Sequence, residues 1–180
     1  MDGRSPGHAA SLESRAMADY RRGNLTAAAD GFAAARQAYA SANEPLKAAE
    51  MANNLCVALV SLGRGEEAVQ AVEGTAEVFA RAGDRVRASQ ALGNLASALE
   101  AAGRLDRAQA VFDQAIEGFR SAGDREGESQ TWHALSRLQL RLGQTFGAAA
   151  SAQAALDSHP RPGIVRRVLR SLLRRSLPRP

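Results

Sequence analysis

The sequence contains few of the residues that build chemical sites. Its single cysteine, Cys56, excludes an internal disulfide and any metal site made from several cysteines. Its three histidines, His8, His133 and His159, are scattered, and no two of them have the spacing of metal ligands. No glycine-rich phosphate loop follows a strand, because the sequence predicts no strands. We therefore predict no metal, no cofactor and no enzymatic activity.

The sequence also lacks long hydrophobic runs. No apolar stretch approaches the length of a membrane span, and no apolar run follows a basic stretch near the N-terminus, as it would in a secretory signal. Aromatic residues make up only 4% of the chain, whereas alanine, the best helix former, is abundant. The bias toward alanine and arginine is typical of a GC-rich bacterial genome. These features predict an all-α protein of the bacterial cytoplasm.

Small residues recur along the chain with a constant period. Four glycines define this period: Gly23, Gly63, Gly103 and Gly143. Three further columns of small residues share it, five and twelve positions after each glycine and seven positions before it. They are Ala28, Ala68, Ala108 and Ala148; Ala35, Thr75, Ala115 and Ala155; and Ala16, Cys56, Ala96 and Ser136. Four columns with one period indicate four structural repeats.

Each repeat is predicted to be a helical hairpin. Glycine accepts the left-handed backbone conformation that ends a helix, and small residues let two helices cross closely. The motifs SANEP, RAGDR and SAGDR, which recur with the same period, separate the repeats, with Asp84 and Asp124 as helix N-caps and Pro45 in a first turn. The predicted helices span about 8–22, 25–41, 45–62, 65–82, 85–102, 105–122, 125–142 and 145–158.

This pattern resembles the tetratricopeptide repeat. The last repeat has consensus residues at Trp132, Leu135, Gly143, Ala148, Ala155 and Pro160. The unit is longer than the usual tetratricopeptide unit, and in this it is similar to the repeats of LGN/Pins adaptors, bacterial Rap-type regulators and the sensor arms of STAND regulators. The resemblance implies a right-handed α-solenoid of four hairpins, at about 8–43, 44–83, 84–123 and 124–160. Outside it we expect a disordered N-terminus (1–7) and a basic amphipathic C-terminal segment (161–180).

The first helices of a tetratricopeptide solenoid line a concave groove that suits a peptide or a helix of a partner. Asn54 and Asn94 are one period apart, and a carboxamide can donate to and accept from a peptide backbone at once. The resemblance implies that they clamp ligand main chain; the alternative is that they hydrogen-bond within the stack or face water. The other groove candidates are Glu13, Met17, Tyr20, Glu50, Asn53, Val57, Val60, Gln90, Ser97, Glu100, Gln130, His133, Arg137 and Arg141.

Three basic residues of the last repeat follow one another at helical-turn spacing. His133, Arg137 and Arg141 would form a basic patch for an acidic peptide or a C-terminal carboxylate, or they are simply a solvated helix face. Glutamates elsewhere in the predicted groove make it mixed in sign. The sequence therefore does not predict the charge of the ligand.

The C-terminal segment differs in charge from the rest of the chain. The segment 161–180 contains seven arginines and no acidic residue, so the part before it carries a net charge of −3 although the whole chain carries +4. An apolar stripe opposite the arginines predicts an amphipathic helix. This helix would cap the last hairpin, lie on an anionic membrane or bind nucleic acid, although no aromatic residues interleave to stack on bases. The predicted contact residues are Ile164, Arg166, Arg167, Leu169, Arg170, Leu173 and Arg174.

The sequence thus predicts a non-enzymatic adaptor that binds a protein or peptide partner in the groove. One alternative is a regulatory sensor that acts in trans on a signalling or transcription partner. Another is an assembly factor held at the inner face of the membrane by its basic tail. Self-association through open solenoid ends is a further expectation, and nucleic acid is the least favoured partner.

Overall fold

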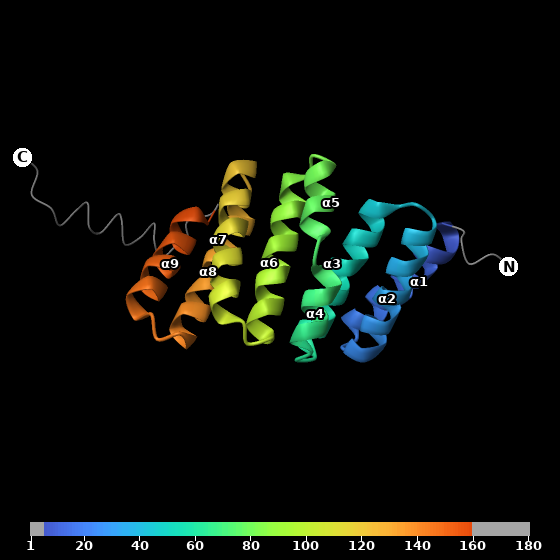
Figure 1. Ribbon diagram of the computed structural model, residues 1–180, viewed down its shortest axis with the longest axis horizontal. Coiled ribbons are helices and arrows are strands. Elements are labelled where there is room, and N and C mark those ends of the chain that lie inside the picture. The colour runs from blue at the N-terminus through green and yellow to red at the C-terminus, as the bar shows by residue number, and fades with distance from the viewer. Residues whose placement is uncertain (1–5, 160–180) are drawn as a thin grey trace, which may run out of the picture.

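The computed structural model describes residues 6–159, which form nine helices and no strand. The helices stand side by side along the long axis of the molecule, with α1 at one end and α9 at the other (Figure 1). They are α1 (Pro6–Arg21), α2 (Leu25–Ser41), α3 (Pro45–Ser61), α4 (Gly65–Val72), α5 (Thr75–Arg81), α6 (Arg85–Ala101), α7 (Leu105–Ala122), α8 (Arg125–Arg141) and α9 (Thr145–Ser158). The predicted α-solenoid of four helical hairpins is confirmed.

The hairpins close at the predicted glycines. All four adopt the left-handed conformation, with φ from 72° to 81°: Gly23, Gly63, Gly103 and Gly143. In the second hairpin the N–H of Gly63 donates to the carbonyl of Val60 at 3.0 Å, and the N–H of Arg64 donates to the carbonyl of Leu59 at 2.9 Å. These bonds satisfy carbonyl groups at the end of α3, which have no partner within the helix. The glycines therefore end one helix and reverse the chain in a single step.

The turns between hairpins end in the predicted N-caps. The Asp84 carboxylate accepts a hydrogen bond from the N–H of Arg87 at 2.9 Å, and the Asp124 carboxylate accepts one from the N–H of Gly127 at 3.0 Å. Pro45 lies in the first turn of α3, where its missing N–H costs nothing. Each first helix thus starts at a defined residue, which fixes the register of the side chains along it.

The columns of small residues are buried, as the repeat predicts. Every member of the three columns is at most 8% exposed. The hydroxyl groups among them are satisfied, because Ser136 donates to the carbonyl of Ala148 at 2.7 Å and Thr75 donates to that of Val72 at the same distance. Gly65 shows how closely the helices approach, since a Cβ there would collide with the backbone of Ala101 and Ala102. Close packing of small residues therefore brings the helices together, both within a hairpin and between neighbouring hairpins.

The predicted helix over 65–82 is wrong in one respect, because it breaks into α4 and α5 at Gly74. This glycine has φ 79° and cannot continue the helix. Two carbonyl groups freed by the break find other donors: Arg36 donates to Ala71 O at 3.3 Å, and the hydroxyl of Thr75 donates to Val72 O at 2.7 Å. Glycine is about 1 kcal/mol less favourable than alanine inside a helix. The other repeats have better helix formers in this column: Ala34, Gln114 and Ala154.

The remaining differences concern the chain ends. α1 begins at Pro6 rather than at residue 8, a difference of the size that helix ends commonly show. The rest of the predicted disordered N-terminus (1–5) and the predicted C-terminal helix (161–180), with all its contact residues, lie outside the described residues. Among the helices of residues 6–159, none is long and apolar enough to cross a membrane.

Candidate protein-binding groove

The first helices of successive hairpins lie next to one another on one side of the stack. α3 packs against α6 and α6 touches α8, while the second helices before α9 pack between two consecutive first helices. Between α6 and α8 the surface sinks into a hollow of about 470 Å³, which we call the α6–α8 hollow. It is lined by Gln90, Gly93, Asn94 and Ser97 of α6, Phe112 and Phe119 of α7, Asp124 of the turn before α8, and Glu126, Gly127, Gln130, Thr131 and Ala134 of α8.

The hollow combines polar walls with an aromatic floor. Among the described residues, no hydrogen bond engages the carboxamide of Asn94, which leaves both its N–H₂ and its oxygen available to a ligand. Across the hollow, Gln130 donates to Glu126 at 3.3 Å, which orients its side chain along α8. Phe112 and Phe119 form the floor, and both are otherwise buried in the core. Such a site offers hydrogen bonds to a backbone and apolar contact to a side chain.

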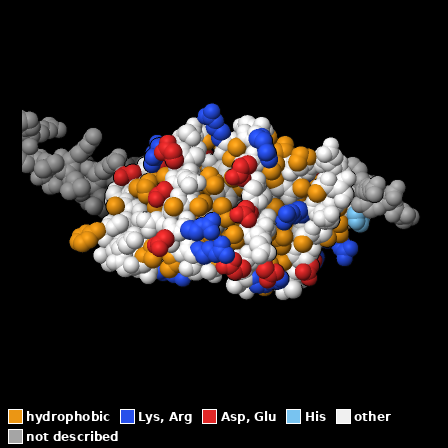
Figure 2. Space-filling model, in the orientation of Figure 1, with side chains coloured by type: hydrophobic (Ala, Val, Ile, Leu, Met, Phe, Trp, Pro, Cys, Tyr) orange, Lys and Arg blue, Asp and Glu red, His pale blue; other side chains and the backbone are white. Residues whose placement is uncertain are grey.

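The charge of the hollow is negative. Of the residues that line it, Asp124 and Glu126 are ionisable, and both are acidic. Asp124 already accepts one hydrogen bond as the N-cap of α8, whereas Glu126 is exposed on the first turn of that helix. Elsewhere the molecule carries both signs, and Figure 2 shows basic and acidic side chains interspersed over the face in view. The hollow is thus a small acidic region on a surface of mixed charge.

Two glycines open the hollow. Gly93 stands where the other first helices have Glu13, Asn53 and His133, and a Cβ at Gly93 would meet nothing within 4 Å. Gly127 stands where the two preceding first helices have Lys47 and Arg87. At the preceding junction the Arg87 guanidinium lies 5.0 Å from the centre of the Phe79 ring and pairs with Asp84 at 2.6 Å. Gly127 has no side chain to do this, and the equivalent ring of Phe119 lines the hollow, although Phe119 is only 4% exposed.

The predicted pair Asn54 and Asn94 does not meet in one hollow. Asn94 lines the α6–α8 hollow, but Asn54 lies half-buried on α3, where α6 packs directly against that helix. The thiol of Cys56 marks this contact, with its sulfur 3.6 Å from the backbone oxygen of Asn94. Burial raises the pKa of the Cys56 thiol to about 12, so it stays protonated, unlike an activated nucleophile.

The other predicted groove residues of α3 face different neighbours. Asn53 points to the second helix of its own hairpin, with its oxygen 3.4 Å from the hydroxyl of Thr75. Glu50 pairs with Lys47 at 3.3 Å, and Lys47 also reaches Glu13 at 3.7 Å. Val57 is half-buried. These residues form the surface of α3 but do not line the α6–α8 hollow.

The predicted basic residues of α8 lie outside the hollow. Arg141 pairs with Glu100 of α6 at 2.6 Å, so its guanidinium joins the two helices at the end away from Asp124. His133 and Arg137 are exposed, and neither forms an ion pair or side-chain hydrogen bond within residues 6–159. The structure therefore separates the acidic hollow from a basic stretch of the same helix.

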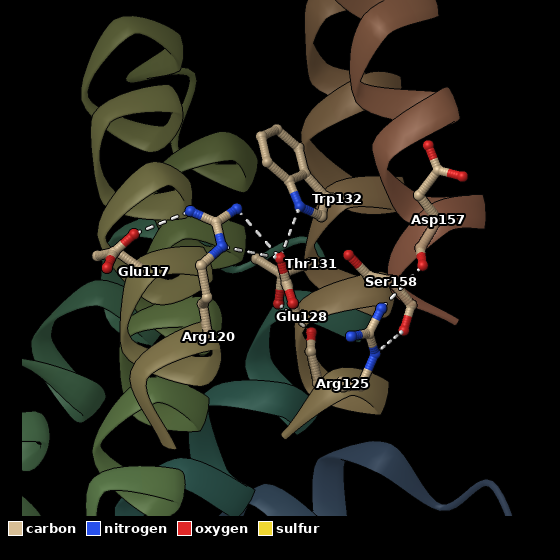
Figure 3. A network of polar contacts seen from close by, with 9 residues as sticks. Glu117, Arg120, Arg125, Glu128, Thr131, Trp132, Asp157 and Ser158 are labelled. Carbon is tan, nitrogen blue, oxygen red and sulfur yellow. Dashed lines mark hydrogen bonds and ion pairs between the residues drawn. The ribbon is translucent and has the colours of Figure 1, made fainter. Parts of the chain in front are cut away.

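A network of polar contacts holds α8 beside the hollow (Figure 3). Glu128, only 7% exposed, accepts hydrogen bonds from Arg120 of α7 at 3.1 and 3.2 Å and from the indole N–H of Trp132 at 3.4 Å. On the other side, Arg125 donates to the carbonyl of Ser158 at 3.1 Å and to that of the preceding residue at 2.9 Å, at the end of α9. The wall that carries Gln130 is thus tied to both neighbouring second helices.

A family model described as tetratricopeptide repeat matches residues 47–121 and 87–160, which together make up more than half of the chain. The chain belongs to the tetratricopeptide repeat family. Its hairpins α3–α5, α6–α7 and α8–α9 all lie almost wholly within the matched residues. The sequence resemblance to this family is therefore confirmed. No curated protein matches the sequence.

Solved structures contain the same tetratricopeptide architecture. BtubC (BKLC) from P. vanneervenii is 22% identical, with 96% of this chain and 67% of that chain covered and a TM-score of 0.72. A putative kinesin light chain from Podosopora anserina is 18% identical, with 98% and 81% covered and a TM-score of 0.71. The Rap conjugation gene regulator of the plasmid pLS20, solved in complex with the Phr* peptide, is 20% identical, with 81% and 41% covered and a TM-score of 0.71. At these identities the likeness shows the fold alone.

The sequence predicted residues on both walls of the hollow but neither its floor nor its acidic end. Gln90, Asn94, Ser97 and Gln130 were predicted groove residues, and all four line the hollow. The signal for the rest was present in the tetratricopeptide columns as the loss of side chains at Gly93 and Gly127. A glycine inside a predicted helix usually has a packing or functional reason. The effect of Gly127 on the hollow depends on its contact with Phe119 of α7, and this contact is seen only in the structure.

Proposed function

We propose that this protein is a non-enzymatic interaction module that binds a segment of a partner protein in the α6–α8 hollow. The observation that carries the proposal is the uncommitted carboxamide of Asn94 above a floor formed by the edges of Phe112 and Phe119. An extended segment of a partner would exchange main-chain hydrogen bonds with Asn94 and place an apolar side chain over the rings. The pre-formed hollow would lower the entropic cost of binding, because α8 is already held by its polar network.

The segment that fits this hollow is basic or uncharged rather than acidic. Asp124 and Glu126 would attract a lysine or arginine of the partner and would repel a carboxylate. A site for an acidic segment would instead need the exposed face of His133 and Arg137, which is outside the hollow. The charge of the lining therefore supports a basic partner segment for this site.

Peptide binding by the same architecture supports the proposal. The structure of the Rap conjugation gene regulator named above contains a bound Phr* peptide. This chain spans about 41% of the length of that regulator. A regulatory role in trans, in which a signalling peptide changes the affinity of this chain for a second protein, is the second candidate function. The adaptor role requires one partner site, which the hollow would supply, whereas the regulatory role requires a second site as well.

A peptide selection tests the proposal. Peptides are selected from a random displayed library on the wild-type chain, and their affinities are then measured by fluorescence anisotropy for four variants. Gly93→Trp fills the hollow and Asn94→Ala removes its clamp, so both are expected to weaken binding by about tenfold or more, which is about 1.4 kcal/mol. The matched controls Gly93→Ala and Asn54→Ala are expected to bind like the wild type. Peptides that bind Gly93→Trp as tightly as the wild type would place the site elsewhere.

The charge preference has its own test. Glu126→Lys reverses the charge at the rim and is expected to weaken the selected peptides about tenfold at low salt, with a smaller effect at high salt. Glu77→Lys, an exposed position on α5 away from the hollow, is the matched control and should change little. If both variants have the same effect, the net charge of the chain and not the hollow sets the preference.

A further inference from the structure

The outer face of the last hairpin is open where the earlier hairpins are covered. On α7, Phe112 and Ile116 are 1% and 2% exposed, because α8 packs over them. The residues of α9 in the same columns, one period later, are Ala152 and Leu156, and Leu156 is 51% exposed. Figure 2 likewise shows apolar side chains on the surface at the α9 end of the molecule. This face has the position and chemistry of a packing surface for another helix.

The sequence after α9 continues in the register of the repeat. α6 begins at Arg85 and α8 begins one period later at Arg125, so the next first helix would begin at residue 165. The amphipathic segment 164–177 starts at this point, a few positions after α9 ends at Ser158. Five residues, 159–163, therefore connect the two, compared with two or three residues in the turns that join the earlier hairpins.

The side chains of the segment match the columns that face a preceding hairpin. On α8 these columns hold Glu128, which contacts Arg120 of α7, and Trp132, one turn later. The segment has Val168 and Leu172 in their place, which are apolar and suit the apolar face of α9. It departs from the pattern at Leu169, in the column of Ser129, whose hydroxyl contacts Ala155 of its own hairpin at 2.7 Å. The match therefore holds on the side that faces the preceding repeat.

From this register we propose that residues 164–177 dock on the outer face of α9 as a further first helix and cover Leu156 within the same chain. Arg166 and Arg170 then fall in the columns of Glu126 and Gln130, which are exposed in the last repeat. Their charges remain in water, and the apolar stripe of the segment is removed from it. The basic tail is thus a part of the solenoid and not a free membrane or nucleic-acid anchor.

Thiol reactivity in the full-length chain tests this docking. In a Cys56→Ala background, one cysteine is introduced at Leu156→Cys, and its rate of reaction with a water-soluble disulfide reagent is measured. The matched control is Leu140→Cys on α8, a site 59% exposed that the segment would not cover. Docking predicts that Cys at 156 reacts roughly tenfold more slowly than Cys at 140, because reaction follows solvent access to the thiolate. Equal rates would overturn the proposal.

Substitutions in the segment identify what protects the thiol. Val168→Asp with Leu172→Asp in the Leu156→Cys chain should restore the fast rate, whereas Arg166→Asp with Arg170→Asp should leave it slow. Protection that vanishes on dilution would show that a second copy, and not the same chain, covers the face, and would overturn the proposal. The same holds if the thiol becomes protected only when vesicles of anionic phospholipid are added. Protection that is independent of concentration and of vesicles supports docking within the chain.

Discussion

The junction between α3 and α6 and the junction between α6 and α8 are built from the same columns but differ in their surfaces. At the first, Arg87 covers the ring of Phe79 and the two first helices pack together. At the second, Gly127 has no side chain over Phe119, which lines the hollow, and the two first helices barely touch. Asn54 and Asn94 hold the same position in the repeat, yet only Asn94 lines the α6–α8 hollow. The position of a residue in the repeat therefore does not determine whether it lines a binding site. The size of the neighbouring side chains determines whether a hollow is present.

The second helices differ in the same comparison. The second hairpin has a helix broken at Gly74, and both of its pieces pack on α6. The third has one continuous helix, α7, whose contact with α8 includes the ion pair between Arg120 and Glu128. An ion pair also crosses the closed junction, between Glu66 of α4 and Arg104, but both side chains are exposed, whereas Glu128 at the open junction is buried. The open junction therefore depends more on a buried polar contact.

The largest expected effect is at the floor of the open junction. Phe112→Ala should lower the free energy of unfolding by about 3–5 kcal/mol, because it removes a buried ring and leaves a cavity. The equivalent change at the closed junction, Val72→Ala, should cost about 2 kcal/mol, since it removes only two carbon atoms. Urea unfolding followed by circular dichroism measures both. Equal losses would mean that the ring of Phe112 is not packed as tightly as its burial implies.

The polar network predicts a smaller loss at the open junction. Glu128→Ala should destabilise the chain by about 1–3 kcal/mol, because the carboxylate is buried and its donors lose their partner. Glu117→Ala is the matched control, since Glu117 pairs with the same Arg120 but its side chain is 69% exposed. An exposed pair contributes at most about 1 kcal/mol. If the two variants are equally stable in urea unfolding, the burial of Glu128 adds nothing to the junction.

The N-cap of the closed junction predicts a pH dependence. Hydrogen bonds from the backbone and the guanidinium of Arg87 hold the pKa of the Asp84 carboxyl below its usual range. Because the folded pKa is lower than the unfolded one, the stabilisation is present above the usual aspartate pKa of about 4 and is lost as the pH falls through the folded value. Asp84→Ala should therefore cost about 1 kcal/mol at neutral pH. A difference from the wild type that stays constant as the medium is acidified would contradict this assignment.

The smallest expected effects on stability are those of replacing two glycines of the open junction by alanine, and they differ in direction. Gly93→Ala should stabilise the chain by about 0.5–1 kcal/mol, because the site has room for a Cβ and alanine favours the helix. Gly127→Ala should not, because its Cβ would lie 2.5 Å from the ring of Phe119. Differential scanning calorimetry compares the two melting temperatures. Stabilisation by both substitutions would show that Phe119 moves freely and that the hollow is not pre-formed.

Much of the fold follows from the sequence because it depends on local, periodic features. Glycine turns, aspartate caps and small-residue columns each act within one repeat, so their spacing predicts the hairpins directly. The break at Gly74 was also visible as a glycine in a helix-forming column, but its outcome depends on Arg36 and Thr75, which supply donors for the freed carbonyls.

The site was less predictable because it depends on contacts between repeats. The repeat spacing predicted that Asn54 and Asn94 have the same role in the groove. The difference arises from Arg87, which lies over the ring of Phe79, and from Gly127, which has no side chain to lie over that of Phe119. Sequence periodicity compares a residue with its equivalents in other repeats and does not describe its spatial neighbours. A single departure from the repeat therefore changed the surface without changing the fold.

Nuclear magnetic resonance of the side-chain amides of Asn54 and Asn94 tests the central claim most directly. A selected peptide is titrated into the isotope-labelled chain, and the two carboxamide resonances are assigned through the variants Asn54→Ala and Asn94→Ala. The Asn94 signal is expected to shift with the binding isotherm, whereas that of Asn54 is expected to stay in place, since only Asn94 lines the α6–α8 hollow. Equal shifts of both signals, or a shift of Asn54 alone, would contradict it.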